Sequence, residues 1–331
     1  MALRFVDSFD LYDTASLDKK YTLTYGATIS TGGRTGNRLV IGADANAIKT
    51  LDAQSTWIVG FAYKWSGDGW SSMCQLSDVS SAQIALRVNA DGSISVCRGI
   101  AQSGTVIGTS SLAISENIWH YIEWKSTINN STGTSEVRID NISVLSLTAQ
   151  DTQSTANATA NSIKFGADYS KAADYDDLVI CDGAGGSFDD FVGDVTIKAC
   201  MPDADSATVD WTPSTGSDHY ALVDEVPPSA TDYVSSGTAD QIDEYSFANT
   251  GYTSATVKAV VVSVVASKSD AGVRTMAIMA HSGATDSAGD EISPSTSALY
   301  YQRMLTTDPN TSAAWSLSAA ETAEFGVKVV S

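Results

Sequence analysis

Positive charge is scarce in this sequence of 331 residues, which has 19 lysines and arginines against 39 aspartates and glutamates. The formal net charge of −20 would repel the phosphates of nucleic acids and anionic lipids, because binding to them depends largely on lysine and arginine. We therefore expect no nucleic acid and no membrane among the partners. Hydrophobic residues make up 43% of the chain, which is enough to build a folded core.

Long apolar runs are also missing. The longest, residues 259–266, is far shorter than the ~20 residues that cross a bilayer. Residues 1–10 lack the apolar stretch of a secretory signal, and we expect them to form the first strand. The cysteines are too widely spaced for a metal knuckle and too few for a disulfide scaffold, which favours buried thiols. They are Cys74, Cys97, Cys181 and Cys200.

Helical periodicity is absent from the first 200 residues, where short alternating segments between Gly, Asn, Asp and Ser turns predict a β-sandwich. Residues 56–65 alternate so that one face carries Trp57, Val59, Phe61, Tyr63 and Trp65. Residues 83–98 predict a hairpin that turns at Asp91-Gly92, and residues 137–147 predict a second that turns at Asp140-Asn141. Further short strands are expected at 163–165, 178–180 and 195–197.

The strand pattern also places two of the cysteines. If residues 72–78 pair antiparallel with 82–88 and the following hairpin has no bulge, Cys74 shares a face with Leu86 and Val96. Cys97 then points to the opposite face. Side chains on opposite faces cannot meet disulfide geometry, so we predict no bond between Cys74 and Cys97.

The second part of the chain begins with residues 201–254, which contain four of the six prolines and few alternating runs. We interpret this stretch as a linker and an extended arm that lies on a neighbouring surface. Residues 255–331 predict a second β-rich domain, in which 256–266 and 273–280 form a hairpin. Capping-box spacing at 318–321 predicts a short helix from Ala319, followed by a strand at 325–330.

Three segments of the first part carry a resemblance to a known fold. Residues 119–124 (WHYIEW), 133–134 and 137–141 (VRIDN) resemble the core of laminin-G and concanavalin A-like jelly rolls. The resemblance covers residues 1–200 and implies a lectin-like jelly-roll domain over that range. It further implies that the first strand, residues 3–9, lies beside a last strand at 188–198, with 175–180 as the penultimate strand.

The second part resembles predicted structural proteins of tailed bacteriophages that carry the same lectin-like domain in front. The resemblance rests on residues 211–214, 223–225, 233–235, 270–272, 314–315 and 324–327. It implies a non-enzymatic component of the virion exterior, on the head, neck, collar or tail. Such a protein would be made in the bacterial cytoplasm and would bind head, neck or tail proteins. It would form a homo-oligomer through its C-terminal half, with the lectin-like domain outward.

Carbohydrate binding is the alternative function, in an adhesin that recognises host surface polysaccharide. Sugars need an aromatic platform with a polar rim, and Trp65 and Trp70 flank a Gly-rich loop that could provide it. Residues 300–303 (YYQR) allow the same interpretation or that of a buried interface strand. A polysaccharide hydrolase comes third, because the Glu-x-Asp-x-x-Glu strand of the β-glucanase members does not occur.

No cofactor is expected, and calcium is the metal that the sequence best accommodates. Lectin-like sandwiches often hold Ca²⁺ with carboxylate oxygens, and Asp174, Asp176 and Asp177 form the acidic cluster to consider, although solvated surface is the commoner meaning of such clusters. The histidines are His120, His219 and His281. They lie far apart in sequence without neighbouring ligands, which predicts neither a catalytic triad nor a zinc site.

Overall fold

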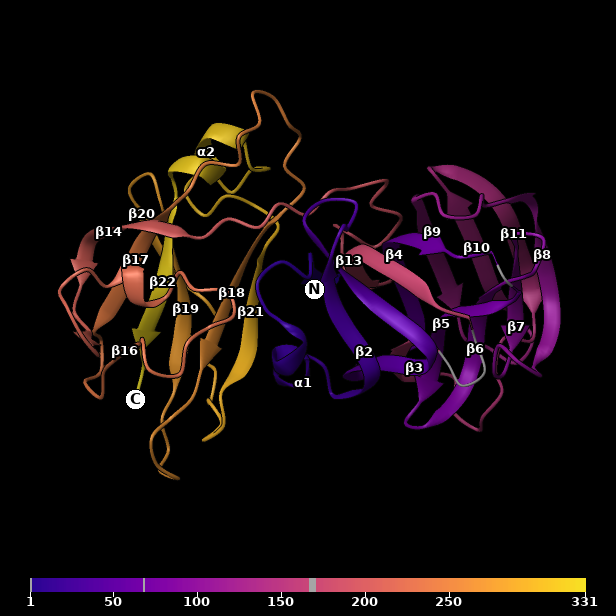
Figure 1. Ribbon diagram of the computed structural model, residues 1–331, viewed down its shortest axis with the longest axis horizontal. Coiled ribbons are helices and arrows are strands. Elements are labelled where there is room, and N and C mark those ends of the chain that lie inside the picture. The colour runs from indigo at the N-terminus through magenta and orange to yellow at the C-terminus, as the bar shows by residue number, and fades with distance from the viewer. Residues whose placement is uncertain (1, 68, 167–170) are drawn as a thin grey trace. The chain divides into compact units, whose positions relative to one another are not determined.

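The computed structural model describes residues 2–67, 69–166 and 171–331. The chain divides into two compact units, Met1–Ile197 and Lys198–Ser331. Each unit has its own sheets (Figure 1). Each also has its own set of buried hydrophobic side chains. In the described part of the chain, no helix is both long and apolar enough to cross a membrane.

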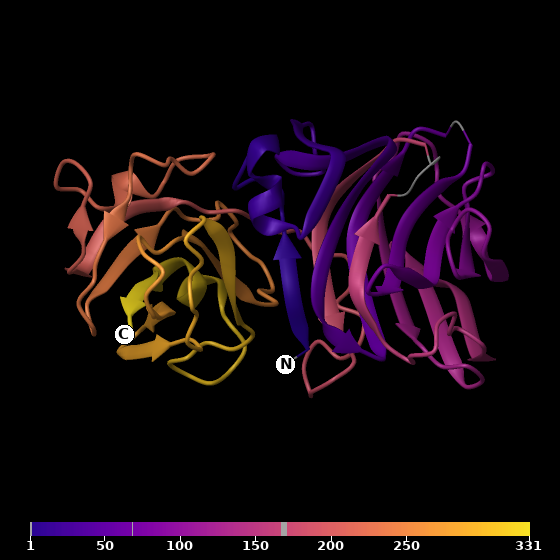
Figure 2. The same ribbon diagram turned by 90° about the horizontal axis from the view of Figure 1, so that it is seen from below.

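The regular structure of the first unit is almost entirely antiparallel strands, drawn from indigo to magenta in Figures 1 and 2. Its short helices are η1 (Thr14–Ser16) and α1 (Leu17–Lys20). Its strands are β1 (Leu3–Asp7), β2 (Leu23–Thr31), β3 (Asn37–Gln54), β4 (Thr56–Trp65), β5 (Ser71–Asp78), β6 (Ser81–Val88), β7 (Ser93–Arg98), β8 (Thr105–Ala113), β9 (His120–Thr127), β10 (Gly133–Ile139), β11 (Ile142–Gln150), β12 (Ala160–Phe165) and β13 (Ala173–Asp182).

These strands form one curled sheet in the order β11-β10-β9-β4-β13-β3-β12-β5-β6-β7-β8, with β1 joined to β13 and β2 to β3. The two ends of the sheet meet, because Ser111 Oγ of β8 donates to the carbonyl of Val144 in β11 at 3.2 Å. Because the sheet curls, its two halves lie face to face as two layers. The side chains that point inward from both layers form one core. The expected all-β jelly-roll sandwich is therefore confirmed for this unit.

Strand β4 shows why the sequence folds this way. Its alternating large side chains all point into the core and are at most 1% exposed. Phe61 and Tyr63 pack edge-on against aromatic rings of neighbouring strands, with ring centroids 6.0 Å apart for Phe61 and Phe165 and 5.1 Å for Tyr63 and Tyr175. One strand of period two thus anchors the aromatic core of the unit.

Both predicted hairpins are confirmed. Strand β6 pairs with β7, and Leu86 lies opposite Val96. Strand β10 pairs with β11 through Asp140 and Asn141, whose φ angles of 50° and 68° suit a tight turn.

The predicted cysteine faces are confirmed as well. Cys74 is paired with Leu86, whereas Cys97 is paired with Ala85, the next residue along the strand. Side chains of consecutive residues point to opposite faces, so the two thiols lie on different sides of the sheet. All four cysteines are free.

The predicted last strand of this unit was wrong. Residues 184–197 contain no strand, and β1 pairs with β13 instead, in a register that includes Val6 opposite Val179. The strand expected at 195–197 belongs to this stretch and is absent too. Side chains, rather than a neighbouring strand, accept the backbone N–H groups of this stretch, as described below.

A buried ion pair fastens the N-terminal segment to the sheet. The Asp7 carboxylate accepts hydrogen bonds from Lys20 Nζ at 2.8 Å, Tyr12 Oη at 2.6 Å and Tyr21 Oη at 3.0 Å. The side chains of Asp7 and Lys20 are 1% and 2% exposed. This set of contacts lets two opposite charges occupy a largely apolar site.

The second unit is built on a sheet in the order β14-β17-β22-β19-β20, together with two separate strand pairs, β15 with β16 and β18 with β21. Its helical elements are η2 (Tyr220–Leu222) and α2 (Leu317–Thr322). Its strands are β14 (Pro202–Val209), β15 (Thr212–Pro213), β16 (Val234–Ser235), β17 (Ile242–Phe247), β18 (Val260–Ala266), β19 (Met276–Ser282), β20 (Thr285–Ala288), β21 (Leu299–Leu305) and β22 (Glu324–Val329).

The predicted linker and arm at 201–254 is corrected by this topology. Two of its segments, β14 and β17, pair with each other, and β17 continues the sheet through β22. The irregular parts are residues 210–241, which contain only η2 and the two-residue strands β15 and β16, and residues 248–254. Most of the predicted arm therefore belongs to the second unit.

The predicted hairpin of 256–266 with 273–280 is also wrong. Strand β18 pairs with β21, where its valines face large side chains such as Tyr300, Tyr301 and Met304. Such pairs of β-branched and aromatic residues stabilise a ladder. The short helix is confirmed, but Ser316 caps it by accepting from the backbone N–H of Ala319.

Lys20→Met tests the buried ion pair. We expect a loss of about 3–5 kcal/mol in unfolding free energy, because the Asp7 carboxylate stays buried without its cation. Urea unfolding followed by tryptophan fluorescence measures the loss. Arg98→Met breaks the half-exposed pair with Asp151 and should cost below about 1 kcal/mol. An equal loss of unfolding free energy in both variants would show that burial does not make the Asp7–Lys20 pair more important than the exposed pair.

Candidate functional site

Charged side chains lie on the outer face of the sheet at β9 and β10. Because strand residues alternate, Ile122 and Trp124 of β9 point into the core and Tyr121, Glu123 and Lys125 point outward. Strand β10 adds Glu136 and Arg138, which form an ion pair at 2.9 Å. Charged side chains from adjacent strands thus lie side by side on this face.

Residues 184–197, here called the covering segment, lie on part of this face. Lys125 Nζ contacts Asp190 Oδ1 at 3.1 Å. The Arg138 guanidinium lies 3.8 Å from the centre of the Phe191 ring, a cation–π contact. The sheet face therefore binds the covering segment through both charge and aromatic stacking.

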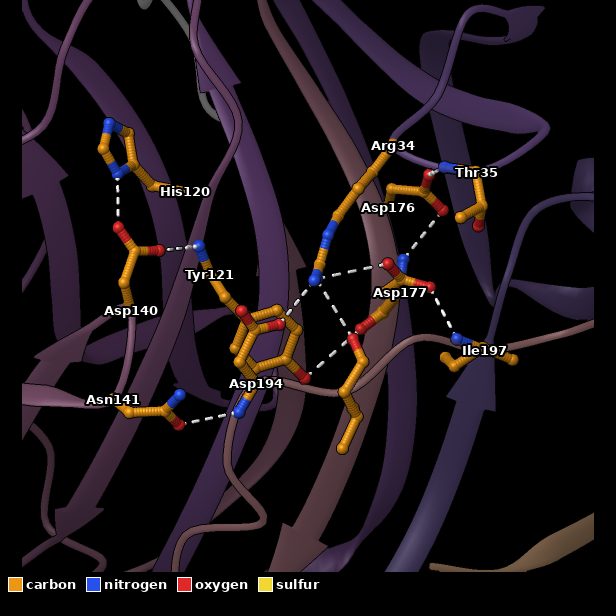
Figure 3. Close-up of polar contacts among 11 residues, drawn as sticks. Arg34, Thr35, His120, Tyr121, Asp140, Asn141, Asp176, Asp177, Asp194 and Ile197 are labelled. Carbon is orange, nitrogen blue, oxygen red and sulfur yellow. Dashed lines mark hydrogen bonds and ion pairs between the residues drawn. The ribbon is translucent and has the colours of Figure 1, made fainter. Parts of the chain in front are cut away.

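Arg34, from the loop between β2 and β3, binds the other end of the covering segment (Figure 3). It donates to the carbonyl of Val195 at 3.1 Å and pairs with Asp194 at 2.6 Å. It also lies 3.4 Å from Asp177 Oδ2 and 5.6 Å from the centre of the Tyr121 ring. One guanidinium thus links the covering segment to β13 and β9.

Backbone N–H groups of the covering segment donate hydrogen bonds to side chains of the same unit. The pairs are Gly193 with Glu123 at 2.9 Å, Asp194 with Asn141 at 2.8 Å and Ile197 with Asp177 at 2.7 Å. Burial raises the pKa of the Glu123 carboxyl, and the hydrogen bond from Gly193 opposes that shift. These carboxylates act as structural acceptors.

Two carboxylates of β13 are fully buried beside this network. Asp176 accepts from the backbone N–H groups of Thr35 at 3.0 Å and of Asp177 at 2.8 Å. Burial and the neighbouring charge of Asp177 raise the pKa of Asp176 to about 7. Burial raises the pKa of Asp177 to about 6, against the opposing hydrogen bond from Ile197 and the charge of Arg34.

The predicted calcium cluster does not form. Asp174 is held by Lys64 at 2.9 Å and by Arg38 at 3.2 Å, whereas Asp176 and Asp177 bind the backbone groups named above. Each of the three carboxylates has its own partners, so their oxygens do not converge on one position. Within the residues that the structure describes, none of them belongs to a group of possible metal ligands.

A second cluster lies where β4 ends and β9 and β13 begin. Lys64 Nζ, which pairs with Asp174, lies 4.8 Å from the centre of the Trp119 ring. The Trp119 side chain is half-buried, and Lys64 and Asp174 are 22% and 16% exposed. We call Arg38, Lys64, Trp119 and Asp174 the sheet-end cluster. It combines an indole with two cations that share one carboxylate.

The two tryptophans predicted to bind glycan have different positions. Trp65 is 1% exposed, and its indole N–H donates to the carbonyl of Gly69, so it is a core residue and not a platform. Trp70 is half-buried in the same loop. Asp68, between them, lies outside the described residues. Tyr300 and Tyr301 of the other predicted platform are half-buried in β21.

Sequence reasoning missed the sheet-end cluster. Its members come from three strands and from the residue before β9, and only pairing of β4 with β13 brings Lys64 opposite Asp174. In the sequence, Trp119 belongs to the pattern that resembles the jelly-roll core. Its position directly before an alternating strand was the one available signal.

Each histidine has an aspartate partner. The ring nitrogen Nδ1 lies 2.7 Å from Asp140 in His120, 2.8 Å from Asp243 in His219 and 2.5 Å from Asp286 in His281. Figure 3 shows the contact of His120 with Asp140. His120 Nε2 also accepts a hydrogen bond from the backbone N–H of Ser115, which fixes the ring. The prediction that no histidine has a cluster of ligands nearby was wrong for His281, which lies beside Glu244 and Asp286.

A scan against protein-family models and a search of curated proteins found no match. Solved structures similar to this chain include an alginate lyase Aly36B mutant in complex with alginate tetrasaccharide, with 11% identity and a TM-score of 0.35 over 46% of this chain and 82% of that one. Carbohydrate-binding module CBM66 from Bacillus subtilis has 10% identity and a TM-score of 0.35 over 48% and 94%. A sialidase has 14% identity and a TM-score of 0.35 over 47% and 16%.

These similar structures are carbohydrate-binding or carbohydrate-processing proteins. The prediction that the chain is not an enzyme is corrected, because alginate lyases and a sialidase are among them. They give no support to the bacteriophage structural role. That role, its location on a particle and assembly as a homo-oligomer stay predictions. A likeness at this level does not itself establish a function.

The buried aspartates predict an unusual dependence of stability on pH. The pKa values of Asp176 and Asp177 are raised above 3.8, so the folded protein binds more protons than the unfolded chain between about pH 4 and pH 7. The unfolding free energy contributed by these groups therefore falls as pH rises through this window. Each proton changes the slope by at most about 1.4 kcal/mol per pH unit.

Asp176→Asn removes one titrating group and should reduce this fall. Urea unfolding at about pH 5 and about pH 7.5 measures the difference, with Asp18→Asn, an exposed position of the same unit, as control. A fall in the Asp176→Asn variant as steep as in the wild type would show that Asp176 does not cause it.

Proposed function

We propose that the first unit binds carbohydrate at the sheet-end cluster. The observation that supports this function is the half-buried indole of Trp119 beside the ion-paired side chains of Lys64, Asp174 and Arg38. An aromatic ring offers an apolar surface to the C–H face of a sugar. Charged groups at its edge can bind the hydroxyl groups.

Preorganisation favours binding at this position. Asp174 is held from two sides by Lys64 and Arg38, and these side chains already occupy one arrangement before a ligand arrives. A ligand therefore orders few further side chains, which lowers the cost of binding. The carboxylate accepts hydrogen bonds from vicinal hydroxyl groups, and the two cations donate to other hydroxyl or carboxylate groups of a sugar.

The covering segment leaves the sheet-end cluster accessible. Its contacts reach Lys125, Arg138, Glu123, Asn141, Arg34 and Asp177. Among the described residues, no hydrogen bond or ion pair joins it to Lys64, Trp119 or Asp174. The outer sheet face thus has one part covered by residues 184–197 and another part that contains the sheet-end cluster. We expect the ligand at the sheet-end cluster.

Trp119→Ala tests this function. We expect the full-length variant to lose at least about tenfold in affinity for the glycans that the wild type binds, equivalent to about 1.4 kcal/mol. A glycan array of neutral and acidic polysaccharides first identifies the bound class, and titration calorimetry then gives the affinities. Lys64→Ala should weaken binding as well, because it removes one of the two cations that hold Asp174.

Tyr25→Ala is the matched control, since Tyr25 is an aromatic residue of the same unit with 67% exposure. It should bind as the wild type does. Thermal unfolding of all three variants checks that they remain folded. Absence of glycan binding by the wild type, or equal binding by Trp119→Ala and wild type, would contradict carbohydrate recognition at this cluster.

A further inference from the structure

The second unit has a group of three side chains that fits a metal ion. One donor atom each from Glu244, His281 and Asp286 lies within 4.8 Å of the others. The residues belong to β17, β19 and β20, three strands of the same sheet. The donor set of one imidazole and two carboxylates is independent of the sheet-end cluster, which lies in the other unit.

The strand register explains how the three side chains meet. Glu244 pairs with Gly326 of β22, and His281 pairs with both Glu324 of β22 and Asp286 of β20. Directly paired residues share a face of an antiparallel sheet, as do residues two apart on one strand. All these positions therefore face the same side. Because Gly326 has no side chain, nothing from that position stands between Glu244 and His281.

Glu244 is the unusual member of the group. The residue is 4% exposed, and its buried Oε1 has no hydrogen-bond partner. A buried carboxylate oxygen without a partner costs free energy, and proteins normally supply a donor or a cation. Burial and the negative charges of Asp286 and Glu324 raise the pKa of Glu244 to about 7. The carboxylate of Glu244, with one oxygen that lacks a hydrogen-bond partner, thus lies beside an imidazole and a second carboxylate.

We propose that Glu244, His281 and Asp286 form a binding site for a divalent transition-metal ion of the zinc class. Imidazole nitrogen with carboxylate oxygen suits zinc better than calcium or magnesium, which prefer oxygen ligands alone. Bonds of about 2.0–2.1 Å place tetrahedral donors about 3.4 Å apart. His281 Nδ1 and Asp286 Oδ1 lie 2.5 Å apart in a hydrogen bond, so these side chains, 35% and 67% exposed, would exchange that bond for bonds to the ion.

The ion would satisfy the Glu244 oxygen and neutralise the surrounding carboxylates. Glu324 adds a further negative charge beside the three ligands. Three protein ligands leave a coordination position for water or for a ligand molecule. Metal binding requires a deprotonated nitrogen of His281 and ionised carboxylates, so we expect affinity to fall at acid pH.

Titration calorimetry of the chelator-treated full-length chain with ZnCl₂ tests the site. We expect one zinc ion per chain with micromolar or tighter Kd, a higher Tm with zinc, and weaker or no heat with CaCl₂. Glu244→Gln should weaken zinc binding at least tenfold while keeping the size of the side chain, and His281→Asn should weaken it more. Thermal unfolding without metal verifies that both variants are folded.

His120→Asn is the matched control. It removes a histidine with an aspartate partner that belongs to no group of three ligands among the described residues, and it should leave zinc affinity and stoichiometry unchanged. Three results would overturn the proposal: no zinc binding at 100-fold excess, unchanged binding by Glu244→Gln and His281→Asn, or equal binding of calcium and zinc. The last would show only general attraction to an acidic surface.

Discussion

Residues 184–197 lie on a sheet face without a neighbouring strand, so their backbone groups depend on side chains for hydrogen bonds. Glu123, Asn141 and Asp177 accept the N–H groups, and Arg34 donates to a carbonyl. This requirement accounts for charged residues on a strand surface that is largely covered. It also gives the buried carboxylates of Glu123 and Asp177 a structural role. The proposed ligand site is the sheet-end cluster, where the ion-paired side chains are still partly exposed.

Local patterns predicted much of this fold because they act over short distances. Alternation along β4 and the Asp-Gly and Asp-Asn turns each depend on adjacent residues, and these elements form as predicted. The same alternation places Trp65 in the core with Trp57, which excludes it as a glycan platform. Alternation therefore predicts a core position for Trp65, whereas the neighbouring Gly-rich loop suggested an exposed one.

The failed predictions concern contacts between distant strands. β18 was expected to pair with the next strand but selected β21, whose aromatic residues complement its valines. Similarly, nothing in the sequence links Glu244 with His281, because β22 lies between their strands and comes last in the chain. Register across three strands decides which polar residues meet, and a single sequence does not encode that register in any local pattern.

The covering segment is followed by residues 198–201 and then by Pro202, the first residue of β14, so it is the part of the first unit next to the connection between the two units. Tension on the second unit would load the contact at Ile197 first, then those at Arg34, and finally those at Arg138 and Lys125. Bonds that break one after another resist less force than bonds loaded together. Under load the segment would peel from the sheet stepwise and lengthen the connection while the sandwich remains folded.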